Sequence, residues 1–167
     1  MIRFTANAQG DGFNGDVEKA IRKALRESLK QLKKDAAAKM RQRYTAPAIG
    51  TKPLRLKVSG LRGTLSTQGP RTPLNRFKTQ PKGRLKKPPA SGIFASVVRG
   101  QGDYLRSAFY ARKVIFQRTS KNRLPIEKLF TVSPPGMLSN RPVYSDVIKK
   151  LQVNFDKNLS KEIGNMF

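Results

Sequence analysis

The chain has 167 residues, with 35 Lys and Arg against 10 Asp and Glu, and contains neither cysteine nor histidine. The missing cysteines exclude disulfides and thiol chemistry, and the two absences together remove the usual zinc ligands and the usual general base near neutral pH. A net charge of +25 opposes a lone compact state by self-repulsion and favours polyanions or acidic protein surfaces as partners.

Hydrophobic residues make up 37% of the chain, which is low for a free-standing compact domain. We therefore expect part of the chain either to extend away from the core or to be buried by partners. Residues 1–15 lack the apolar core of a signal peptide, and no run of about 18 apolar residues indicates a membrane span. The composition predicts a protein that stays in the compartment where it is made.

The N-terminal part predicts a short strand followed by a long helix. Ile2–Ala6 alternates like a strand, and a helical period of apolar residues runs from Asp16 to Arg43. Asn14 offers an N-cap, and the helix would be about 40 Å long. Its other face is basic and carries Lys19, Arg22, Lys23, Arg26, Lys30, Lys33 and Lys34. Two interpretations stay open at even weight, a solvated face and a surface that docks on an acidic partner.

The next segment, residues 45–89, is rich in proline and free of acidic residues. It holds seven of the eleven prolines, and 15 of the 35 basic residues lie in the acid-free stretch from Ala36 to Gly102. Leu54–Val58 alternates and predicts a strand with one basic face, with Thr64–Thr67 as its partner. From Gln68 onward the pattern shows little periodicity.

We therefore predict that residues 45–89 form a basic extended arm or insertion that orders against a neighbouring subunit or DNA. Trimming Gly69–Pro89 should then abolish assembly and leave the body folded. Its candidate DNA- or partner-contacting residues are Arg71, Arg76, Lys78, Lys82, Arg84, Lys86 and Lys87. Phe77 is the only aromatic residue among them, which argues against a stacking platform for single strands. Sequence-independent contact with DNA phosphates, contact with acidic proteins and plain solvent all stay open.

The C-terminal half predicts strands and then a helix. Gly92–Val98, Ser107–Gln117 and Leu124–Phe130 have strand composition, and Pro125 must start its strand or lie on an edge. Pro134–Gly136 ends the sheet. Asn140 then caps a helix that runs to about Ile163, with Gly164 as its C-cap. The apolar stripe of this helix is expected to be Tyr144, Ile148, Leu151, Phe155 and Leu159.

This order of elements predicts an α+β fold. An antiparallel sheet would pack against the long N-terminal helix and the C-terminal helix, within a single domain over residues 1–167.

Few residues are suited to catalysis. Seven of the ten carboxylates lie on predicted helices, mostly beside Lys or Arg, where surface pairing explains them. Asp103 and Glu127 form the only pair that could flank a sheet, and a two-metal site needs several converging carboxylates. Gly60–Gly63 is not a phosphate loop, because no Gly-Lys-Ser/Thr follows it. We therefore predict no enzyme activity, no cofactor and no metal.

Four motifs in order carry a resemblance to a known family. They are Arg71–Phe77, Gly92–Val98 with Ala108–Arg112, Asn122–Glu127, and Val132–Leu138. Together they resemble the phage minor tail protein Z family, in which a basic turn runs into Arg-hydrophobe-Pro-Ile and a Pro-Ser-x-Pro-x-Met-Leu corner enters the last helix. The corner departs slightly here, since Val132 replaces the first proline. The residues that match the signature are Arg123, Leu124, Pro125, Ile126, Ser133, Pro135, Met137 and Leu138.

The resemblance implies a structural virion protein of the tail or neck, active in tail completion and head–tail joining. It further implies a homo-oligomeric ring around the DNA channel, next to other tail or neck proteins such as the tail terminator or connector, with sequence-independent DNA contact and no membrane. The protein would be found in the virion, and in the host cytoplasm during assembly. The alternative from composition alone is a non-specific nucleic-acid-binding protein, and a DNA-processing enzyme is disfavoured by the missing histidine.

Overall fold

The computed structural model describes residues 2–7, 15–46, 52–83 and 90–165. They group into two compact units. The first unit comprises Met1–Met40, Gly50–Gly69 and Pro135–Phe167, and the second comprises Arg41–Ile49 and Pro70–Pro134. The single domain over residues 1–167 stays a prediction, and each unit is described below by itself.

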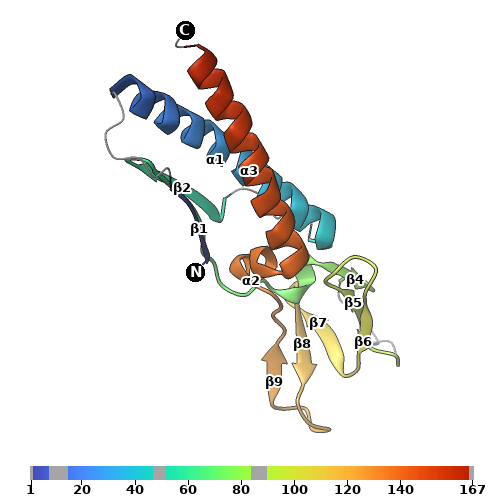
Figure 1. Cartoon of the computed structure of the whole chain (residues 1–167). Helices are drawn as coiled ribbons and strands as arrows, with labels where there is room; N and C mark the ends of the chain where they lie inside the picture. Colours follow the sequence, from blue (N-terminus) through green and yellow to red (C-terminus); the bar gives the residue numbers. More distant parts are fainter. Residues whose placement is uncertain (1, 8–14, 47–51, 84–89, 166–167) are drawn as a thin grey trace. The chain divides into compact units, whose positions relative to one another are not determined.

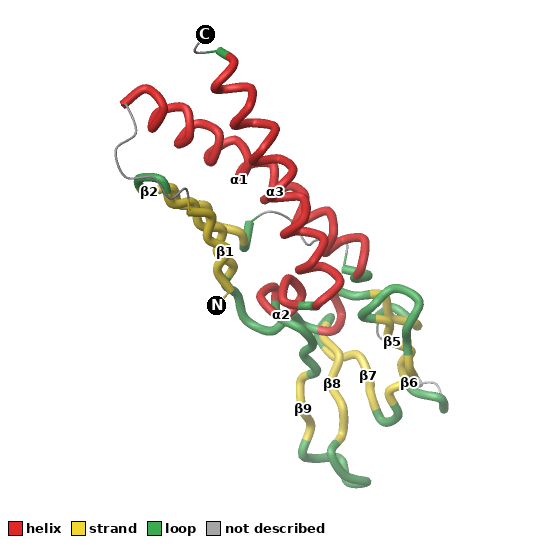
Figure 2. The backbone as a smooth tube through the Cα atoms, in the orientation of Figure 1, coloured by secondary structure: helices red, strands yellow, loops and turns green. Residues whose placement is uncertain are grey.

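The α+β class and the antiparallel pairing are confirmed (Figures 1 and 2). The strands do not form the single sheet that was expected. They form three sheets of three strands, with the orders β1-β3-β2, β4-β5-β6 and β7-β8-β9. The first sheet belongs to the first unit and the other two belong to the second.

Helix α1 (Gly15–Arg43) and strands β1 (Ile2–Asn7), β2 (Leu54–Ser59) and β3 (Arg62–Thr67) begin the first unit. The predicted strands are all present, and α1 starts one residue before the predicted position. Strands β2 and β3 form a hairpin, in which Gly60 takes the positive φ of +57° that the first position of a type II′ turn requires. At Gly63 on β3, an added Cβ would lie 2.6 Å from Leu29 Cδ1 of α1, so the strand approaches the helix closely.

Helix α1 also contacts α3 (Arg141–Gly164), which follows the short helix α2 (Pro134–Ser139). The two long helices run antiparallel, and the buried Ser28 hydroxyl of α1 lies in their interface. It donates to Ala24 O at 2.7 Å and accepts from Asn158 Nδ2 at 2.9 Å. This hydroxyl is therefore satisfied on both helices, as a fully buried polar group must be.

The buried stripe of α3 differs from the prediction in its first two turns only. Val143 and Val147 are buried there and Tyr144 is 41% exposed, whereas Leu151 is buried as predicted. Asn140 is the N-cap residue as expected, although its side chain makes no capping hydrogen bond. Gly164 lies inside the last turn, and Asn165 is the C-cap residue.

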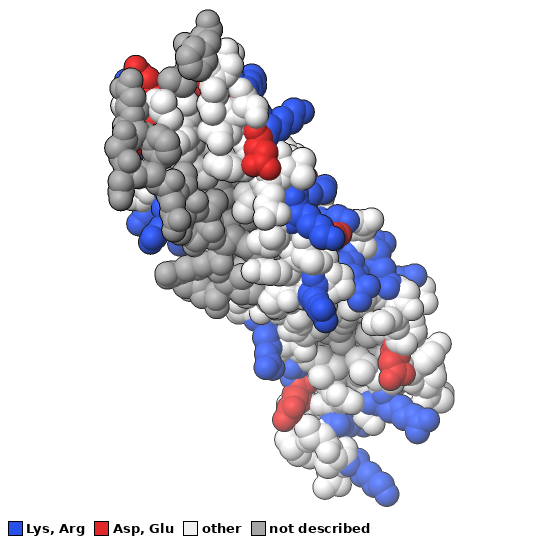
Figure 3. Space-filling view, in the orientation of Figure 1, with Lys and Arg blue, Asp and Glu red and all other residues white. Residues whose placement is uncertain are grey.

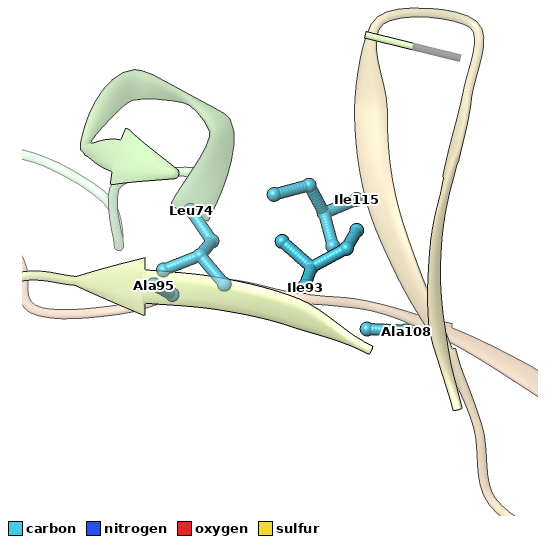
Figure 4. Close-up of a cluster of buried hydrophobic side chains, with 5 residues drawn as sticks. All are labelled: Leu74, Ile93, Ala95, Ala108 and Ile115. Atoms are coloured by element: carbon cyan, nitrogen blue, oxygen red, sulfur yellow. The ribbon is translucent and has the colours of Figure 1, made fainter. Parts of the chain in front are cut away.

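The second unit contains a 3-10 turn, η1 (Leu74–Arg76), and six short strands. The strands are β4 (Lys78–Gln80), β5 (Ile93–Ser96), β6 (Asp103–Leu105), β7 (Ala108–Ala111), β8 (Val114–Arg118) and β9 (Ile126–Lys128). Five buried side chains form its core, in which Ala108 and Ile115 of one sheet meet Ile93 and Ala95 of the other, together with Leu74 (Figure 4). Because strand side chains alternate, each sheet has its inner face on this core and its other face turned outward.

The prediction of a basic arm is wrong for residues 70–83. Leu74, Phe77 and Thr79 are buried, with 6%, 3% and 1% of their surface exposed. The backbone is bound as well, since Leu74 N donates to Leu129 O at 3.1 Å and β4 pairs with β5. Trimming Gly69–Pro89 would therefore remove part of a core rather than a free arm. Residues 84–89 lie outside the described residues.

Replacing Phe77 tests this correction. Phe77→Ala should lower the free energy of unfolding by about 3–5 kcal/mol, because it empties a buried aromatic site. Arg76→Ala, one residue away and exposed, should change it by no more than about 0.5 kcal/mol. Urea unfolding followed by circular dichroism measures both. If both variants changed the free energy of unfolding by the same small amount, the interpretation of residues 70–83 as an arm would be correct after all.

Residues 44–46 are anchored to the end of β5. Tyr44 and Ala46 are each 3% exposed, and Thr45 N donates to Val97 O at 3.0 Å. Burial raises the pKa of the Tyr44 phenol. The folded protein therefore keeps this proton at a pH at which the unfolded chain has lost it.

This shift predicts a loss of stability in alkali. The contribution of Tyr44 is fully present below its unfolded pKa of about 10 and is lost as the pH rises through the folded pKa. Tyr44→Phe should reduce the fall in unfolding free energy between about pH 8 and about pH 10.5. Tyr104→Phe is the matched control, because Tyr104 is 56% exposed. The assignment fails if both variants lose as much stability as the original chain.

Candidate functional site

Positive charge is balanced unequally in the two units. Six ion pairs join described residues, and each lies wholly within the first unit. The second unit has Asp103 and Glu127 as its only carboxylates, against fourteen described Lys and Arg. None of those fourteen forms an ion pair with a described carboxylate. Figure 3 shows basic side chains scattered over the visible face with few acidic ones among them.

Of the seven residues predicted to contact DNA or a partner, Arg71, Arg76, Lys78 and Lys82 are exposed. They alternate along the chain with the buried anchors Leu74 and Phe77, so the core positions hold the segment while its cations face solvent. Arg84, Lys86 and Lys87 lie outside the described residues.

The basic face of α1 is partly neutralised by nearby carboxylates. Lys19, Arg22 and Lys30 pair within the helix, with Asp16, Glu18 and Glu27 respectively. Lys23 reaches Glu162 of α3 at 2.7 Å. Four of the seven predicted cations thus have an acidic partner in the same unit, which favours the interpretation of an ordinary paired surface. The hydrogen bond from Lys30 holds the pKa of the Glu27 carboxyl below its usual value.

The signature residues fall into two groups that are placed differently. Arg123, Leu124, Pro125 and Ile126 are exposed at the turn between β8 and β9, with Leu124 66% exposed. Met137 and Leu138 of α2 are buried, and Ser133 and Pro135 are half-buried. The corner motif therefore contributes to a core, whereas the turn motif faces solvent.

Asp103 and Glu127 do not flank the same sheet. Asp103 lies on β6 and Glu127 on β9, which belong to different sheets, and both are exposed. The Asp103 carboxylate accepts a hydrogen bond from Tyr104 N at 2.7 Å. Across the described ranges, no cluster of three acidic residues suited to a metal ion occurs. Within the same ranges, no helix combines the length and apolarity needed to cross a bilayer.

The second unit instead carries a surface that the sequence did not reveal, the outer face of the β7-β8-β9 sheet. Phe109 and Phe116 are cross-strand partners whose rings stack at 6.2 Å between centroids. Arg118 lies over the Phe109 ring at 5.5 Å, and Lys128 lies over the Phe130 ring at 5.0 Å. We call these five residues the aromatic face. The pairing register brings them together from three segments of the chain.

The hairpin between β7 and β8 turns on Arg112 and Lys113, which have positive φ angles of 48° and 63°. A type I′ turn demands this backbone, and Asn-Gly is the usual sequence because longer side chains are strained there. Asn75 Nδ2 donates to Lys113 O at 2.8 Å and helps to hold the turn. The chain thus places two exposed cations at a hairpin tip despite the local cost.

Comparisons of the chain with protein-family models, with curated proteins and with solved structures found no match.

The strained turn leads to a stability prediction. Replacing Arg112 by Asn and Lys113 by Gly should raise the free energy of unfolding by about 1 kcal/mol, because both new residues tolerate positive φ. Replacing both by Gln removes the same charges and keeps the backbone strain, so it should gain clearly less. Urea unfolding of both double variants decides the matter. If the Gln double variant gained as much unfolding free energy as the Asn-Gly variant, the loss of charge alone would explain the effect.

Proposed function

We propose that the protein is a structural component of a phage tail or neck, which acts in tail completion and head–tail joining as a ring around the DNA channel. The motif resemblance to the minor tail protein Z family supplies the identity of the assembly. The observation that carries the proposal in the molecule is the uncompensated positive charge of the second unit. Such a surface favours a polyanion or an acidic neighbour.

The placement of the signature residues supports the same proposal. Met137 and Leu138 are explained by packing, whereas Leu124 leaves most of its apolar surface in water. An exposed apolar side chain at a projecting turn, flanked by Arg123, suits contact with a neighbouring subunit or ring. The partners proposed are further copies of this chain and an adjoining tail terminator or connector.

Residues 70–83 belong to a folded unit and do not form a free arm, so their proposed role differs from the one predicted from the sequence. Arg71, Arg76, Lys78 and Lys82 are held on a folded unit, so they would meet DNA or an acidic protein as a fixed surface. Contact with DNA phosphates by such a surface is independent of base sequence and weakens as salt concentration rises.

A pair of four-fold variants tests the proposal in the assembling phage. Replacing Arg71, Arg76, Lys78 and Lys82 by Gln should lower the yield of infectious particles by at least about tenfold, because several phosphate or carboxylate contacts are lost. Replacing Lys19, Arg22, Arg26 and Lys30 by Gln makes the same charge change on α1. This control should leave the yield nearly unaffected, since three of its four cations are paired within the helix.

Electron cryo-microscopy of the intact virion supplies the second readout. The proposal predicts a ring of copies of this chain at the tail or neck. Absence of the chain from purified virions would overturn it. Equal yields from the two four-fold variants would remove the role given to the four cations.

The alternative function is non-specific nucleic-acid binding by a free subunit, which the charge of the second unit also favours. It predicts DNA binding whose affinity falls steeply with salt, together with absence from the virion. The microscopy result therefore separates the two functions.

A further inference from the structure

The aromatic face combines two properties that differ from those of the rest of the basic surface. Phe109 and Phe116 lie on neighbouring strands, and Phe130 follows β9 with 48% of its surface exposed. None of the three belongs to the core cluster, which takes Ala108 and Ile115 from the opposite side of the same strands. Alternation along the strands places the rings on the outward side.

The charges on this face are all positive. Arg118 and Lys128 each lie over a ring, and both side chains are exposed. Glu127 is the only acidic residue on the three strands, and its position between Ile126 and Lys128 turns it to the other side of β9. Arg112 and Lys113 at the hairpin tip add two more exposed cations along the same sheet.

We propose that the aromatic face binds single-stranded nucleic acid. Bases would stack on Phe116, which is half-buried on β8, and on Phe130, which follows β9 and is 48% exposed. Arg118 and Lys128 would leave their rings to meet phosphates, which their exposed positions allow. Rings that accept any base, surrounded by cations that follow a backbone, give binding that tolerates all sequences.

Charge complementarity favours a nucleic acid over a second copy of this chain, since two surfaces with net positive charge repel each other. The rings favour single strands over a duplex, because bases that are already stacked and paired cannot stack on a protein ring. This inference goes beyond a tail or neck role and concerns the free subunit.

Fluorescence anisotropy of a labelled oligo-dT of about 16 nucleotides with the full chain tests the proposal. Phe130→Ala and Phe116→Leu should each raise the Kd for oligo-dT by about fivefold or more. Phe116→Leu keeps an apolar side chain at a half-buried position, and circular dichroism verifies the fold. Tyr104→Ala is the matched control. It removes an exposed ring that pairs with Phe94 on the other sheet of the unit, and it should leave the Kd unchanged.

A duplex of the same length and Lys128→Gln complete the experiment. Lys128→Gln should weaken oligo-dT binding and reduce the salt slope by about one, while the two Phe variants should leave the salt slope unchanged. The proposal is overturned if the Phe variants bind oligo-dT as tightly as Tyr104→Ala. It is also overturned if the duplex binds as tightly as oligo-dT and loses the same affinity in the Phe variants. Neither failure touches the proposed place in the virion, which depends on particles rather than on the free chain.

Discussion

The chain has only ten carboxylates to offset the charge of its 35 Lys and Arg residues. Where these carboxylates lie determines how far charge repulsion is offset in each unit. Three of them join the two long helices. Glu162 pairs with Lys23, Asp35 with Lys150, and Asp146 with Lys39. The hydrogen bond from Lys39 holds the pKa of Asp146 below its usual value, so this contact favours the folded state above the ordinary pKa range of a carboxyl group and weakens in acid. The interface of α1 and α3 therefore holds apolar packing and opposite charges together.

The second unit is stabilised by other means. Its core is small, and thirteen of its fourteen described Lys and Arg side chains are exposed, where water and salt screen their repulsion. Two of them rest on aromatic rings, which attract a cation without supplying a negative charge. These contacts do not neutralise the positive charge of the unit. Its net positive charge would therefore remain available to attract a polyanion.

The helices could be predicted from the sequence because their signal is local. The period of α1 marks its boundaries within one residue, whereas in α3 two apolar stripes compete, and packing selects Val143 and Val147 over Tyr144. Residues 70–83 could not be placed from the sequence, because their partners are distant in the chain. Leu74 N donates a hydrogen bond to Leu129 O, and β4 pairs with β5. The aromatic face could not be predicted from the sequence for a related reason. The turn at Arg112 and Lys113 lacks the Asn-Gly signal, so nothing local set the register that joins Phe109 to Phe116.

We propose that the second unit is the part of the molecule that binds a polyanion. Hydrogen–deuterium exchange of the full chain, measured with and without saturating oligo-dT, tests it most directly. The account predicts slower exchange in peptides that cover β7, β8 and β9, and unchanged exchange along α1 and α3. Protection confined to peptides of α1, or no protection anywhere, would contradict it.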